Sequence, residues 1–217
     1  MRPTSHRSVR AAQRSAEVLD AAAAVLARQG YDGTSVDAIA DELGATKGVI
    51  YHYYRSKADI LLGVLEAGFQ HLMADVAPIA ARSDVPADER LYEMCLAHSR
   101  AMMNHHSYQV VSIRNIEQNI GHRDGRQEGQ WSKIVARRGE YEQLFVRVVS
   151  EGCDDGIFKT ADPRLTTRAL LGALNWIAVW FDPAADPHGK ATPAEISEHI
   201  SRFVVAGAHG LPDWPAS

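Results

Sequence analysis

The sequence predicts an all-α protein, and three observations support that prediction. Apolar residues recur at steps of three and four in most long segments, as on one face of a helix. Clusters of glycine, proline and aspartate separate these segments, for example at residues 153–163 and 182–193. Strict alternation of apolar and polar residues, typical of half-buried strands, is not evident. A chain of 217 residues is long enough for one or two domains with a true core.

Four helices are expected in the first eighty residues. Glycines are typical helix stops because they adopt a left-handed backbone without strain, and hydroxyl residues are typical helix caps. On these grounds we expect a first helix ending at Gly30, a second from Thr34 or Ser35 to Gly44, a third from Thr46 to Tyr54, and a long fourth at about 57–77, with a break at Pro78.

The remaining segments predict helices at about 87–106, 107–119, 127–152, 163–182 and 193–208, which makes about nine helices in all. The segment at 163–182 is apolar nearly all round, so we expect it to be buried on more than one side. The segment at 193–208 has a single apolar stripe.

Charge is distributed unevenly along the chain. Residues 1–57 carry eight Lys and Arg against six Asp and Glu, whereas residues 58–217 carry fifteen against twenty-one. An anionic partner at the N-terminal end alone would fit this asymmetry, and so would a solvated basic tail. The two cysteines are far apart, which favours a reducing, cytoplasmic setting. We expect neither a signal peptide nor a transmembrane span.

The stretch LGATKGVIYHYY, residues 43–54, carries the chemistry of the N-terminal end. Two short helices joined by a turn at Gly44 are typical of a helix-turn-helix, whose second helix enters the major groove of DNA. Gly48 lacks a side chain near the helix start, where backbone N–H groups and Thr46 favour a phosphate. Ile50 and Tyr54 are expected to face inward. Tyr51, His52 and Tyr53 cannot all do so.

At these residues the sequence resembles the N-terminal domain of the TetR family of transcriptional regulators. The similarity covers residues 12–60 and includes Gly30-Tyr31, Gly33-Thr34, Gly44, Lys47-Gly48, Tyr51, Tyr54 and Ser56-Lys57, with Ala45-Thr46 where Val-Ser is common. The resemblance implies a flexible basic arm at 1–11, a DNA-binding domain at 12–57 and a ligand-binding and dimerisation domain at 58–217. It implies DNA contacts at Thr34, Thr46, Lys47, Gly48, Tyr51, His52, Tyr53 and Lys57.

The C-terminal half is similar to a subgroup of that family that regulates fatty-acid or sterol breakdown. The similar segments are LLGALNWIAVWFDP and TPAEISEHISRFVVAG. The resemblance implies a small apolar effector, with an acyl-CoA or steroid-CoA ester as a candidate, and release from an inverted-repeat operator. Arg114, Arg137 and Arg138 are candidates for meeting the CoA phosphates.

Two further sets of residues follow from the composition of the C-terminal half. Soft and aromatic side chains with few polar groups are typical of small-molecule sites. They predict a ligand site at Met94, His98, Met102, Val110, Ile113, Tyr141, Phe145 and Trp176, with Met103 nearby in sequence. Two apolar helices that one body cannot easily bury predict a two-fold homodimer interface at Ala169, Gly172, Ala173, Ile196, Ile200, Phe203, Val204 and Gly207.

Other classes of protein are less well supported by the sequence. Cys95 and His98 share a helix face, followed by His105 and His106, which leaves a metal-sensing or other helical binding protein open as an alternative. A helical enzyme is a third possibility, although the sequence has no GxSxG, P-loop or HExxH motif. We therefore expect a double-stranded DNA operator, a small-molecule effector and a second copy of the chain as partners, with no cofactor, no metal and no membrane.

Overall fold

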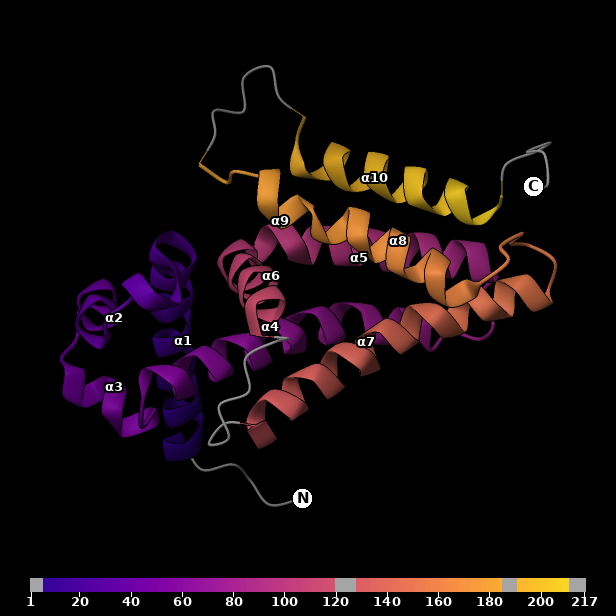
Figure 1. Cartoon of the computed structure of the whole chain (residues 1–217). Coiled ribbons are helices and arrows are strands. Elements are labelled where there is room, and N and C mark those ends of the chain that lie inside the picture. Colours follow the sequence, from indigo (N-terminus) through magenta and orange to yellow (C-terminus); the bar gives the residue numbers. More distant parts are fainter. Residues whose placement is uncertain (1–5, 120–127, 185–190, 211–217) are drawn as a thin grey trace. The chain divides into compact units, whose positions relative to one another are not determined.

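The computed structural model describes residues 6–119, 128–184 and 191–210. Over these residues the chain is helical, with no strand, which confirms the predicted fold class. The helices are α1 His6–Gly33, α2 Val36–Leu43, α3 Lys47–Tyr53, α4 Lys57–Ala80, α5 Ala87–Asn104, α6 His106–Asn119, α7 Glu128–Asp154, α8 Pro163–Asn175, α9 Ile177–Trp180 and α10 Pro193–Ala208 (Figure 1).

The helices form two compact units. One contains the described residues up to Gly68 together with Ser107–Ile134, and the other contains Phe69–His106 and the described residues from Val135 onward. The first unit thus holds α1 to α3, the start of α4 and nearly all of α6. This division describes packing. The expected functional boundary after residue 57 stays a prediction.

Hydrogen bonds explain why α6 packs with the N-terminal helices. The Tyr108 hydroxyl donates to Asp20 of α1 at 2.8 Å, and the buried Gln109 amide donates to the Gly68 carbonyl of α4 at 3.2 Å. A Cβ atom on Gly68 would lie 3.1 Å from the Ser112 hydroxyl, so the glycine allows this close approach.

In the second unit, α10 packs on α5 and α8, and α5 also packs on α8 and α9 (Figure 1). The N-terminus of α10 has a capping box, because Thr192 accepts from the Glu195 backbone and the Glu195 carboxylate accepts from Thr192. Pro193 occupies the first turn, where a missing N–H costs nothing. These local signals explain why α10 agrees with the predicted range 193–208.

The structure corrects three expected boundaries. Residues 6–11 of the expected flexible arm belong to helix α1, and residues 1–5 lie outside the described residues. Helix α4 continues through Pro78 to Ala80, because a proline in a last turn removes a single backbone hydrogen bond. The single helix expected at 163–182 is instead α8 and α9, separated at Trp176.

Helix α4 has the length and hydropathy of a membrane span. Among the described helices it alone meets those two criteria, and half of its most apolar window is buried inside the protein. A core helix meets the same criteria, so the finding carries no further conclusion.

Candidate DNA interface and buried effector site

The turn between α2 and α3 is fixed by local chemistry. The Ser35 side chain caps α2 by accepting from the Ala38 backbone at 3.0 Å. Gly44 ends α2 with φ 63°, in the left-handed region where glycine is unstrained, and the Ala45 N–H then donates to the Ala40 carbonyl. Thr46 is extended and α3 begins at Lys47. The predicted helix-turn-helix is therefore present.

The inward side of α3 packs against the N-terminal helices. Ile39, Ala40 and Ile50 are buried, and the Tyr54 hydroxyl forms a 3.0 Å hydrogen bond with Ser15 of α1. Because Ile50 and Tyr54 are held by the core, the opposite side of α3 must face outward. The predicted inward orientation of these two residues is confirmed.

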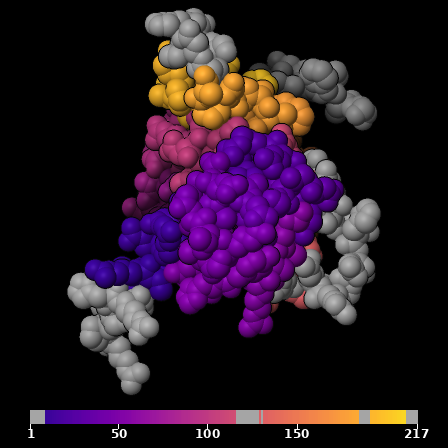
Figure 2. Space-filling view, turned by 90° about the vertical axis from the view of Figure 1, so that its left-hand side faces the viewer, coloured from indigo at the N-terminus to yellow at the C-terminus, as the bar shows by residue number. Residues whose placement is uncertain are grey.

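The outward side of α3 is polar and aromatic. Thr46, Lys47, Gly48 and His52 are exposed, Tyr51 is 51% exposed, and Tyr53 is partly exposed with its ring edge-on to His52 at 4.8 Å. Figure 2 shows the face of the molecule to which α2, α3 and the start of α4 contribute, in purple. The chain covers only about half of the Tyr51 side chain, so its ring can contact an outside partner.

Gly48 is not required by the fold. A Cβ atom there would meet only the Thr46 hydroxyl, at 3.6 Å, which is an ordinary van der Waals contact. Gly48 lies inside α3, where glycine is less stable than alanine by about 0.5–1 kcal/mol. The chain thus carries an unfavourable residue where alanine would fit, which indicates that the missing side chain serves a close approach from outside.

Lys47 is held by an ion pair that a phosphate could replace. Its ammonium lies 2.7 Å from the Asp37 carboxylate, and both side chains are largely exposed. Exposed ion pairs contribute about 0–1 kcal/mol, so exchanging Asp37 for a phosphate costs little.

Two of the expected DNA contacts have other roles in the structure. Thr34 is only 3% exposed and its hydroxyl donates to the Gly30 carbonyl at 2.6 Å, so the hydroxyl is engaged within the chain and a Thr34 contact with DNA stays a prediction. The Lys57 ammonium donates to the carbonyls of Tyr31 and Thr34, at 2.7 and 2.9 Å, and lies 4.3 Å from the Tyr31 ring centroid. Lys57 therefore joins the α1–α2 connection to α4.

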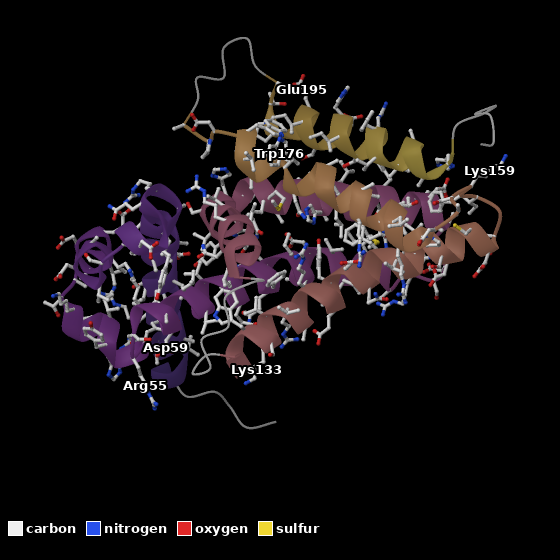
Figure 3. All side chains as sticks on the ribbon, viewed as in Figure 1. Arg55, Asp59, Lys133, Lys159, Trp176 and Glu195 are labelled. Atoms are coloured by element: carbon white, nitrogen blue, oxygen red, sulfur yellow. The ribbon has the colours of Figure 1, made fainter. Side chains whose placement is uncertain are left out.

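Arg55 was not among the predicted contacts. It follows Tyr54, the residue that caps the end of α3, and is exposed (Figure 3). Its position between the aromatic residues and Ser56-Lys57 is the signal that could have identified it, because a cation beside a recognition helix favours the DNA backbone.

Part of the predicted ligand site is brought together in the second unit. His98 of α5 hydrogen bonds to Tyr141 of α7 at 2.7 Å, and Phe145 lies edge-on to His98 with ring centroids 6.2 Å apart. Met94 and Met102 lie one turn to either side of His98 on α5, and all five side chains are buried.

Three other predicted ligand-site residues are not part of this cluster. Trp176 is 59% exposed, at the point where α8 ends and α9 begins (Figure 3). Val110 and Ile113 belong to the first unit, with α6. The periodicity of the sequence predicts which residues share a helix face, but it does not predict which other helix packs against that face.

The candidate CoA-binding arginines are partly engaged elsewhere. Arg114 donates to the Ala27 carbonyl at 2.6 Å, and Arg137 pairs with Glu140 at 3.0 Å. Arg138 is exposed on α7.

The metal-sensing alternative gains no support from the described residues. They contain no group of three or more His, Cys, Asp or Glu that could hold a metal ion. Burial raises the pKa of the Cys95 thiol, which keeps it protonated and makes it a poor metal ligand.

An exposed apolar face extends over α8, α9 and α10. Phe203 is 72% exposed, and Leu165, Trp176, Val179 and Trp180 are also among the exposed large apolar residues. Of the predicted interface residues, Ala169, Gly172 and Gly207 are exposed, and Ala173, Ile196 and Ile200 are partly exposed. Val204 is buried within its own chain, so it does not belong to this face. A patch of this kind marks an interaction surface.

A polar hollow of about 380 Å³ lies at the start of α5. Its lining includes Asp84, Arg90, Glu151, Asp154 and Asp155. The buried Arg90 pairs with Glu151, so the hollow contains a structural ion pair and does not include the predicted ligand-site residues.

A helical protein with an exposed helix-turn-helix and a separate helical body is typical of a DNA-binding regulator. Comparison with known proteins agrees. Residues 18–64 match the family of bacterial regulatory proteins described as the tetR family, and residues 84–208 match the tetracyclin repressor-like C-terminal domain. Because the second match covers more than half of the chain, the chain belongs to the tetR family of bacterial regulatory proteins.

Several relatives are similar over nearly their whole length. The transcriptional repressor KstR2 of Mycobacterium tuberculosis is 28% identical over 196 residues, covering 89% of this chain and 92% of that protein. The fatty acid metabolism regulator protein of Bacillus subtilis is 24% identical, covering 89% and 94%. The structure of KstR2 from M. tuberculosis, described as a ketosteroid transcriptional regulator, matches with a TM-score of 0.76 and 25% identity. The match covers 89% of this chain and 94% of that one.

Proposed function

We propose that this protein is a cytoplasmic, ligand-responsive transcriptional regulator that binds an inverted-repeat operator as a homodimer. Its proposed mode of action is repression that a small apolar effector relieves, which the description of KstR2 as a repressor supports. The observation that carries the proposal is the outward face of α3, which combines exposed Tyr51 with a glycine that the fold does not need.

In this proposal α3 enters the major groove, with α2 beside it. Thr46, Lys47, Gly48, Tyr51, His52 and Tyr53 are the proposed contacts, and Arg55 is added. Tyrosine and histidine can donate to phosphates or present ring edges to bases, whereas Lys47 and Arg55 contribute charge. Lys57 acts by holding the α1–α2 connection in place.

The homodimer is proposed to form through the exposed apolar face of α8 to α10. A two-fold contact would bury Phe203 and Trp176 of both copies. Recognition helices that reach successive major grooves are about 34–36 Å apart, which requires an inverted repeat.

The effector is proposed to bind among the buried residues around His98, in the second unit. Relatives described as regulators of ketosteroid and fatty-acid metabolism support a largely apolar effector, with an acyl-CoA or steroid-CoA ester as a candidate. Helix α4 begins at Lys57 in the first unit and ends in the second. It is therefore the proposed connection between effector and DNA.

Selection from a random-sequence duplex library tests the DNA-binding part. We expect an inverted repeat whose affinity falls steeply between about 50 and 200 mM salt, because phosphate contacts release counterions. Enrichment of no sequence, or of a single half-site bound by a monomer, would contradict the proposal.

Titration of the selected complex tests the effector. Fatty acyl-CoA and steroid-CoA esters are added, each beside its free acid. A hundredfold loss of DNA affinity corresponds to a coupling of about 2.7 kcal/mol. Release by a thioester but not by its acid supports the CoA ester, and no release by any compound removes that candidate while leaving the regulator in place.

A further inference from the structure

His98 and Tyr141 form a buried polar pair in the core of the second unit. The Nδ1 atom of His98 lies 2.7 Å from the Tyr141 hydroxyl, and the two residues are 1% and 4% exposed. The other ring nitrogen of His98, Nε2, is buried and makes no hydrogen bond. A buried polar atom without a partner costs about 1–3 kcal/mol, so such atoms are rare and need an explanation.

The hydrogen bond to Tyr141 determines which nitrogen carries the proton. Burial raises the pKa of Tyr141 well above its usual value, so its hydroxyl stays protonated and can donate. If Nδ1 accepts from that hydroxyl, a single N–H is left unpaired, at Nε2. The opposite tautomer would leave both the tyrosine proton and the Nε2 lone pair without partners. The first arrangement is therefore favoured, and Nε2 is a donor.

The imidazole is neutral at physiological pH. Burial lowers the pKa of His98 to about 4, and a side-chain interaction with Asn175 of α8 opposes this shift, although no hydrogen bond of normal geometry reaches Nε2. A neutral donor suits a neutral acceptor. A carboxylate in the same place would be buried without a cation, which is unfavourable.

The surroundings of Nε2 can adapt to an apolar molecule. Met94 and Met102 lie on the His98 face of α5, and Phe145 is edge-on to the imidazole. Methionine side chains are unbranched and polarisable, so they rearrange around irregular shapes at low cost. One hydrogen-bond donor among soft apolar groups is typical of small-molecule sites.

We propose that His98 Nε2 is the polar anchor of the effector site and donates to a ketone, ester or thioester carbonyl on an otherwise apolar ligand. Tyr141 is a positioning residue, because it holds the imidazole in the donating tautomer. The proposal rests on the proposed effector-responsive function and adds the chemical class of the ligand.

Matched probes test the anchor directly. The ketone probes are methyl nonyl ketone and progesterone. The matched probes for methyl nonyl ketone are its methylidene isostere, in which CH2 replaces the carbonyl oxygen, and undecanoate. Binding to the full-length protein is measured by calorimetry. We expect the wild type to bind methyl nonyl ketone about tenfold more tightly than the isostere, the ratio that one net hydrogen bond provides.

Variants assign that preference to His98. His98→Phe should bring the ketone-to-isostere ratio close to one, and Tyr141→Phe should lower it only in part. If His98→Phe alone unfolds the protein, the double variant His98→Phe/Tyr141→Phe replaces it in the binding experiment. The double variant removes both partners of the hydrogen bond, so no unpaired hydroxyl is left in the core. His105→Phe, at the end of α5, is the matched control and should keep the full ratio.

A spectroscopic readout separates anchoring from a purely structural role. In protein labelled with 15N-histidine, methyl nonyl ketone should move the His98 Nε2–H proton downfield, and the isostere should not. Equal binding of ketone and isostere, an unchanged ratio in His98→Phe, or no binding of either ketone to the wild type would overturn the anchor. Operator binding is measured in parallel, and its absence in the wild type would instead count against the proposed function.

Discussion

Replacing Gly48 by alanine should stabilise the protein and weaken its binding to DNA. An added Cβ meets only the Thr46 hydroxyl, at 3.6 Å, so the folded chain accommodates it. Alanine is favoured over glycine inside a helix by about 0.5–1 kcal/mol. For a chain of this size, that gain corresponds to a rise in Tm of about 1–4 °C.

The same methyl group should obstruct DNA. If the α3 backbone lies against a phosphate or a base edge at Gly48, the added carbon separates the two surfaces. We expect a loss of about tenfold per recognition helix, or about 1.4 kcal/mol, and about a hundredfold for a dimer that uses two. Fluorescence anisotropy with the selected duplex measures this loss, and circular dichroism measures Tm.

Gly139→Ala is the matched control for this experiment. Gly139 is an exposed glycine within α7, and a Cβ there would meet nothing within 4 Å. It should raise Tm by a similar amount and leave DNA affinity unchanged. Wild-type DNA affinity in Gly48→Ala would refute the reasoning, since the glycine would then have no partner outside the fold.

Three further predictions follow from single side chains. Lys57→Ala should lower the free energy of unfolding by about 1–3 kcal/mol, because it removes charged hydrogen bonds to two carbonyls. The salt dependence of DNA binding should stay unchanged. A plot of log affinity against log salt that is flatter by one unit would instead identify a phosphate contact. Phe203→Glu should give monomers in sedimentation, with a near-normal Tm and no operator binding. The control Val135→Glu, at an exposed apolar residue on α7, should remain dimeric. Dimers of Phe203→Glu would place the interface elsewhere. The third concerns His98, whose pKa burial lowers to about 4, so the unfolded chain takes up a proton below pH 6.5 that the folded chain accepts only near pH 4. Stability should therefore fall by about 2 kcal/mol between pH 7.5 and pH 5, and urea unfolding should show a smaller fall in the His98→Phe/Tyr141→Phe variant.

The helical class and the helix-turn-helix could be predicted from local sequence patterns. Both depend on local chemistry, because a helix repeats its apolar residues along its own length and its ends are set by nearby residues. Gly30 and Gly44 were predicted helix stops, and both adopt a positive φ. The ends of α10 follow in the same way from Thr192, Glu195 and a glycine-rich end.

The contacts of several predicted site residues depend on how the helices pack, and local patterns do not predict them. Thr34 and Lys57 belong to a polar motif in the sequence, but their side chains bind backbone carbonyls at the end of α1 and in the α1–α2 connection. Trp176 and Val204 lie on apolar stripes, yet one is exposed and the other buried. The physical reason is that periodicity defines which residues share a helix face, whereas burial depends on which other helix covers that face. The pairing of His98 with Tyr141, 43 residues apart, arises in the same way, because α5 and α7 meet only in the folded chain.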